Sequence, residues 1–137
     1  MSKEQLVAAV KRINTLQASG DNDGAIEAYR DLFSQPWFTA NKPEHQRQAL
    51  KMLILAKRTG APTPAIIEAH RAAVPALTEL VSTLEEPEDY EMLGICHLLI
   101  GNEQAAGNMF RQGLTLERSR NAASDLCGRL MTRVSSI

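Results

Sequence analysis

The chain has 137 residues, a formal net charge of −1 and a hydrophobic fraction of 44%, which fits one compact domain of ordinary size. This near-neutral charge argues against a protein that coats nucleic acid or is held to acidic lipid by charge. Aromatic residues make up only 4%, so the core must consist mainly of aliphatic side chains, which suits packed helices better than a β-sandwich.

Helical periodicity dominates from the N-terminus. The first helix carries Leu6, Val10, Ile13 and Leu16 on one face and should stop at Ser19-Gly20. Asp21 or Asn22 can cap a second helix, which should end before Pro36. The spacing therefore predicts a helical hairpin at the start of the chain.

The middle of the chain predicts two more helices after an aromatic connector at 36–41, which we expect to fold back onto the body. Asn41 can cap a third helix that ends at Thr59-Gly60, and Thr63 can cap a fourth that reaches about Leu84. Pro75 lies inside the fourth pattern, so we expect either a kink or a break there.

Three helices follow in the last third. Acidic residues at 85–89 favour a helix start, Gly101 favours its end, and a partner helix should run from Glu103 to about Glu117. A last amphipathic helix should begin at about Asn121. Since no segment alternates with period two, the fold class is all-α, with about seven helices including a C-terminal capping helix.

Helix-stopping glycines recur at Gly20, Gly60 and Gly101, at intervals of 40 and 41 residues. Each is followed within a few residues by an alanine of the next helix. A helical hairpin that repeats at such a period is typical of a stacked solenoid.

The clearest unit reads Tyr90-x2-Leu93-Gly94-x2-His97, followed by Ala106-x3-Phe110. It resembles the tetratricopeptide repeat, W-x2-L-G-x2-Y then A-x3-F then P, with Arg118 where the proline would fall. The resemblance implies a right-handed hairpin solenoid in a single domain, 1–137. Its approximate units are 2–36, 42–84 and 86–118, with a capping helix at 119–136.

Cys96 and His97 invite a catalytic or metal interpretation, but adjacent residues point about 100° apart on a helix. We expect them to pack, His97 with a local hydrogen bond, while Gly94 and Ala106 are small because two helices approach closely there. Cys127 belongs to no Cys-x-x-Cys pair, so both cysteines should be buried, reduced thiols.

Enzyme chemistry finds little support in the sequence. The three histidines, His45, His70 and His97, fall on different expected helices, and no phosphate-binding loop or nucleophile elbow is present. We therefore expect no catalytic residue, no cofactor and no metal site.

The resemblance to tetratricopeptide repeats implies a concave binding face on the first helix of each hairpin. It implies a non-enzymatic adaptor, scaffold or small chaperone that holds a peptide or helix of a partner protein. The expected partner-binding residues are Asn14, Gln17, Arg47, Lys51, Ile54, Arg58, Glu91, Ile95, Leu98 and Leu99. Leu98 and Leu99 are either an open docking site or are covered by the C-terminal helix.

Two alternatives stay open. Apolar parts of that face or the last helix could form a homodimer. Nucleic-acid binding is less favoured, because no stacking aromatics are interleaved with the basic residues; these are Lys42, Arg47, Lys51, Lys57, Arg58, Arg111, Arg118, Arg120, Arg129 and Arg133. The N-terminus has no apolar leader and no run approaches 18 apolar residues, so we expect no membrane insertion and a cytoplasmic location.

Overall fold

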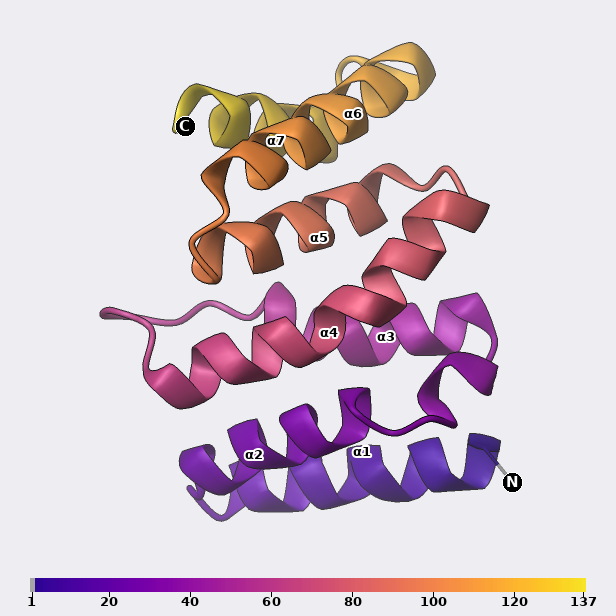
Figure 1. Ribbon diagram of the computed structural model, residues 1–137, viewed down its shortest axis with the longest axis vertical. Coiled ribbons are helices and arrows are strands. Elements are labelled where there is room, and N and C mark those ends of the chain that lie inside the picture. The colour runs from indigo at the N-terminus through magenta and orange to yellow at the C-terminus, as the bar shows by residue number, and fades with distance from the viewer. Residues whose placement is uncertain (1) are drawn as a thin grey trace. The chain divides into compact units, whose positions relative to one another are not determined.

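The computed structural model describes residues 2–137, and these form seven α-helices, one short 3-10 helix and no strand (Figure 1). The all-α prediction is confirmed. The helices are α1 (Ser2–Ala18), α2 (Asn22–Phe33), η1 (Phe38–Ala40), α3 (Pro43–Ile54), α4 (Pro64–Thr83), α5 (Pro87–Leu99), α6 (Glu103–Asn121) and α7 (Asp125–Ser135). They form two compact units, one up to Ala76 and one over Leu77–Ile137, with the boundary inside α4.

In the first unit, α1 and α2 pack as a hairpin around Gly20 (Figure 1). Gly20 has a φ of +82°, the left-handed conformation that ends many helices. The Asp21 side chain accepts a hydrogen bond from the Gly24 amide at 2.9 Å. Asp21 is therefore the cap of α2, which decides between the two candidate residues.

The aromatic connector folds back onto this unit, as expected. Phe38 is fully buried, and its ring meets that of Phe33 edge-on with 5.2 Å between centroids. The Asn41 side chain is turned to this connector as well: its amide donates to the carbonyls of Trp37 and Phe38, at 3.3 and 3.2 Å. The prediction that Asn41 caps α3 is thus wrong, and Lys42 holds the N-cap position without a side-chain bond.

The third helix also ends earlier than predicted. α3 stops at Ile54, and not at Thr59-Gly60. Arg58 Nη1 donates to the Leu53 carbonyl at 2.7 Å, so a side chain satisfies one of the acceptors left open at this helix end. The cap of α4 is as predicted, because Thr63 Oγ1 accepts from the Ile66 amide at 3.3 Å.

Pro75 does not break α4, which is helical from Pro64 to Thr83 (Figure 1). A proline in a helix interior removes one backbone donor and crowds the carbonyl four residues earlier, here that of Arg71. The Pro75 ring is exposed to solvent. Of the two alternatives, the separate helix beginning at Pro75 is excluded.

The second unit contains a hairpin of α5 and α6 around Gly101, whose φ is +87°. A Cβ added to Gly94 would overlap the ring of Phe110, and Ala106 is fully buried. This confirms that Gly94 is small because α6 comes close to α5 at this point.

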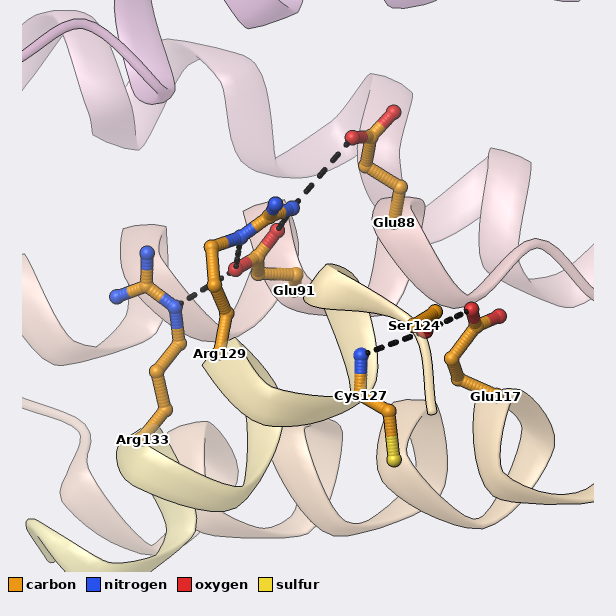
Figure 2. Close-up of polar contacts among 7 residues, drawn as sticks. All are labelled: Glu88, Glu91, Glu117, Ser124, Cys127, Arg129 and Arg133. Atoms are coloured by element: carbon orange, nitrogen blue, oxygen red, sulfur yellow. Dashed lines mark hydrogen bonds and ion pairs between the residues drawn. The ribbon is translucent and has the colours of Figure 1, made fainter. Parts of the chain in front are cut away.

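The helix that closes the chain begins later than predicted, because α6 continues to Asn121 and α7 starts at Asp125. Ser124 fixes this start: its hydroxyl accepts from the Cys127 amide at 3.0 Å and donates to Glu117 at 2.6 Å (Figure 2). The α6–α7 core consists of Ala106, Phe110, Leu114, Cys127 and Leu130, with Ile95, Leu126 and Val134 packed against it.

Candidate functional site

An open apolar groove runs between α1 and α3 in the first unit. Its volume is about 250 Å³, and most of its wall is aliphatic. Val7, at the centre of the α1 wall, has 45% of its surface exposed. The groove is lined by Lys3, Leu6, Val7, Val10, Lys11, His45, Gln48, Ala49 and Met52.

The ionisable groups at this groove are all basic. Lys3 and Lys11 border it from α1 and His45 from α3, and no carboxylate is among its lining residues. An apolar floor between two ammonium groups suits an apolar side chain that is flanked by negative charge. The groove therefore favours a ligand that inserts an apolar side chain and carries negative charge beside it.

A second, more polar cleft of about 500 Å³ lies where α2 and α4 begin, next to the loop that joins α3 to α4. It brings together two of the predicted binding residues, Gln17 and Arg58. Its lining residues are Gln17, Asn22, Asp23, Ala25, Ile26, Ala56, Lys57, Arg58, Thr59, Ala61, Thr63 and Ile66.

Buried polar groups lie beside this cleft. Tyr29 is fully buried, and its hydroxyl has no hydrogen-bond partner among the described residues. Burial raises the pKa of Tyr29, while a weak hydrogen bond with the Gln17 side chain, too poor in geometry to count as a partner, and the charge of Arg58 lower it by less. His70 Nδ1 donates to the Ile66 carbonyl at 2.7 Å; burial lowers the pKa of His70 and the charge of Arg58 adds to this, while that hydrogen bond opposes it.

In the second unit, Glu91 is the centre of a cluster of charged residues (Figure 2). Its side chain is fully buried and accepts hydrogen bonds from two arginines of α7, from Arg129 at 3.1 and 2.9 Å and from Arg133 at 2.9 Å. Glu88 lies 3.7 Å from the Arg129 guanidinium. Glu91 thus attaches α7 to α5, and its carboxylate is occupied within the chain.

The charge state of this cluster follows from its geometry. Burial alone would raise the pKa of Glu91, but the hydrogen bonds and charges of Arg129 and Arg133 outweigh it and hold the pKa below its ordinary value. The same contact with Glu91 raises the pKa of Arg129. Arg133 also lies over the Phe110 ring, 5.8 Å from its centroid, so it holds α7 to α6 as well.

The other predicted binding residues have varied surroundings. Asn14, Gln17 and Arg58 are exposed, Arg47 and Lys51 are half-buried, and Ile54 is only 5% exposed. In the second unit Leu99 is half-buried and Ile95 packs against the α6–α7 core.

Leu98 is 42% exposed, so α7 leaves this side chain open to solvent. Of the two alternatives, an open surface or one covered by the C-terminal helix, the open surface is the correct one for Leu98.

Several basic residues of the nucleic-acid alternative already have partners. Arg129 and Arg133 bind Glu91, and Arg120 binds the Glu86 carboxylate and the Glu85 carbonyl. Arg111 donates to Asn108 at 2.7 Å. The ion pairs of Arg120, Arg129 and Arg133 reduce the positive charge that the second unit can offer to phosphates.

Cys96 and His97 pack within the second unit, as predicted. Cys96 is fully buried, which raises the pKa of its thiol to about 12, and Cys127 is also buried and free. Burial lowers the pKa of His97, and its Nδ1 has no hydrogen-bond partner among residues 2–137, so the expected local bond is absent at this atom. No group of three or more His, Cys, Asp or Glu side chains within the described residues is placed to hold a metal ion.

The groove residues Val7, Val10 and Met52 are not among the binding residues expected from the sequence. A signal was present, because Val7 and Val10 precede Asn14 and Gln17 by whole helical turns and so share their face of α1. Comparison of the chain with protein-family models, curated proteins and solved structures gives no match. None of the described helices combines the length and the apolar character needed to cross a membrane.

Proposed function

We propose that this protein is a non-enzymatic interaction module, an adaptor, scaffold or small chaperone, that binds a peptide or helix of a partner protein. Its hairpins would stack as a right-handed solenoid similar to tetratricopeptide repeats. The observation that supports the proposal most directly is the apolar groove between α1 and α3, which are the first helices of two successive predicted hairpins.

The size of the groove favours a peptide over a cofactor. Small-molecule sites usually have volumes of about 300–1,000 Å³, whereas the groove has about 250 Å³ and is open to solvent along α1 and α3. This volume suits one or two large apolar side chains that project from a partner helix, with the rest of the helix outside. Lys3 and Lys11 would then contact acidic residues of that partner.

The first test is capture of partner proteins from native lysate with three forms of the chain. Val7→Asp places a charge in the groove, and Leu98→Asp places the same charge at the other open candidate surface, on α5; the two side chains are similarly exposed, at 45% and 42%. We expect the wild type and Leu98→Asp to retain the same protein and Val7→Asp to lose it, with unchanged circular dichroism in all three.

Other outcomes contradict the proposal in distinct ways. Loss of the protein with Leu98→Asp alone would move recognition to α5 and remove the groove from the proposal. Capture of nothing by the wild type, together with a dimeric mass that Val7→Asp reduces to a monomer, would favour the homo-oligomeric alternative.

A further inference from the structure

We infer that the polar cleft at the beginnings of α2 and α4 binds a phosphate group, either as the free ion or as a small phosphate monoester. The inference is independent of the α1–α3 groove and of the partner proposed for it. It rests on the donors that line the cleft, on its charge, and on a buried hydroxyl group beside it.

The lining of the cleft is rich in donors. Lys57 and Arg58 supply cationic N–H groups, and the side chains of Gln17, Asn22 and Thr59 add amide and hydroxyl donors. No carboxylate forms an ion pair with Arg58 in the described chain; its one hydrogen bond there runs from Nη1 to the Leu53 carbonyl, which leaves other N–H groups of its guanidinium for a ligand. A phosphate group has several strong acceptor oxygens and suits such a set of donors.

The electrostatics of the cleft favour an anion. α4 has 20 residues and no acidic residue in its first turn, so the positive end of its dipole is uncompensated. Asp23 is the one acidic residue in the lining, and it offsets one of the two cationic side chains. The neighbouring Asp21 carboxylate is not among the lining residues and accepts a hydrogen bond from the Gly24 amide.

Tyr29 supplies an independent observation. On α2 it follows the cleft residues Ala25 and Ile26 by four and three positions, which places it on the same helix face, and the cleft residues Gln17 and Arg58 are near enough to lower its pKa. Its hydroxyl is buried and makes no hydrogen bond of good geometry in the described chain, although the Gln17 side chain lies near enough to lower the pKa of Tyr29 by a weak hydrogen bond. Unpaired buried polar groups are rare and costly, and an oxygen bound between Gln17 and Arg58 would accept this hydroxyl proton.

The volume of the cleft allows for more than a bare ion. About 500 Å³ lies within the usual range of about 300–1,000 Å³ for small-molecule sites. Ile26 and Ile66 provide apolar walls that an organic substituent would contact. Inorganic phosphate and phenyl phosphate are therefore the two probes that distinguish the free ion from the ester.

The experiment is a titration of the ¹⁵N-labelled full chain with each probe at constant ionic strength. We expect amide shifts that saturate and that centre on residues 22–25 of α2 and on residues 58–66 of the loop and first turn of α4, while Val7 and Val10 in the groove stay unchanged. Tighter binding of phenyl phosphate would assign the site to monoesters, and equal affinity would assign it to the free ion.

Charge variants test the donors. Arg58→Gln should weaken phosphate binding about tenfold or more, since it removes a charge-assisted hydrogen bond to the phosphate. Asp23→Asn should strengthen it several-fold, because a like charge is removed from the lining. Arg30→Gln, on an exposed position of α2 outside the cleft, should leave it unchanged.

Because Arg58 also bonds the end of α3, Lys57→Gln serves as a second donor variant and should weaken binding without that structural effect. The inference is overturned if phosphate causes no saturable shifts, if shifts scatter over surface lysines throughout the chain, or if Asp23→Asn and Lys57→Gln both bind as the wild type does. A protein captured through the groove would leave the proposed function intact in each of these cases.

Discussion

Gly94 is the residue whose small size matters most to the α5–α6 hairpin, because the Phe110 ring occupies the space that a Cβ would fill. Gly94→Ala should gain up to about 1 kcal/mol in helix propensity but should lose about 1–3 kcal/mol through overpacking against Phe110. We expect a net decrease in the free energy of unfolding, measured by urea denaturation.

The matched control is the double variant Gly94→Ala with Phe110→Leu. Leucine lacks the ring that the new methyl group would meet, so the alanine should be less harmful in that background than in the wild type. Equal costs in both backgrounds would contradict the packing explanation of Gly94.

Glu91 stabilises the second unit, because its carboxylate binds two arginines of α7. Breaking a buried ion pair typically costs about 3–5 kcal/mol, but Arg129 and Arg133 are 45% and 33% exposed, which weakens the pair. Glu91→Gln should therefore cost about 2 kcal/mol in denaturation experiments at neutral pH. Glu68→Gln, which removes an exposed pair with Arg71, should cost less than about 0.5 kcal/mol.

The pKa of Glu91 also gives a pH dependence. Since the folded-state pKa lies below the ordinary value of 4.5, the folded chain binds fewer protons than the unfolded chain in this range. The stabilisation by Glu91 is thus fully present above that value and is lost as the pH falls through the folded-state pKa.

Denaturation of the wild type and of Glu91→Gln between about pH 7 and about pH 3 measures this contribution. The difference in their free energies of unfolding should shrink as the pH falls below 4.5. A difference that stays constant with pH would show that the cost of Glu91→Gln comes from packing and not from charge.

At the scale of the element, α4 contains the clearest local defect. Pro75 gives the helix no backbone donor for the Arg71 carbonyl, and its ring is exposed, so replacing it removes little packing. Pro75→Ala should raise the free energy of unfolding by about 1–2 kcal/mol, less than the full proline penalty of about 3 kcal/mol because alanine also loosens the unfolded chain. Thermal unfolding and amide exchange of residues 71–79 measure it.

A decrease in the free energy of unfolding would contradict this prediction for α4. If Pro75→Ala lowers the free energy of unfolding, the ring or the helix geometry that it imposes contributes to packing. Glu79→Ala, at an exposed position of α4 beyond this turn, controls for the general effect of an alanine in the helix.

Helix starts with a capping side chain and helix ends with a glycine could be predicted from the sequence. Asp21, Thr63 and Gly20 act as expected, since their effects are local. The end of α3 could not be predicted, because Arg58 reaches back to Leu53 only once the loop has folded. Asn41 likewise bonds to a preceding connector whose course the sequence does not specify.

Across the molecule, hydrophobic periodicity predicted the helices, but it did not predict which of their faces are buried by other helices and which stay open. Glu91 was assigned to a binding face, whereas the structure buries it under two arginines of α7, a contact between residues about forty positions apart. Local pattern cannot reveal such a pairing. The α1 wall of the groove was predictable in principle, because Val7 and Val10 extend the same helix face as Asn14 and Gln17.

The boundary between the two compact units lies within α4, which bears on how they unfold. α4 contributes fully buried residues on both sides of the boundary, including Ala73 in the first unit and Leu77 in the second. Loss of the second unit should therefore unravel a helix that the first unit needs, and we expect one cooperative transition. Trp37, the single tryptophan, reports on the first unit by fluorescence, and the buried thiols of Cys96 and Cys127 report on the second.

Glu91→Gln provides the perturbation, because it weakens the second unit alone. If the units are coupled through α4, the urea midpoints of Trp37 fluorescence and of thiol reactivity both fall, by the same amount. A fall in the thiol midpoint with an unchanged Trp37 midpoint would mean that the units unfold independently. In that case α4 would be a helical connection between two small domains, and the prediction of a single domain would be wrong.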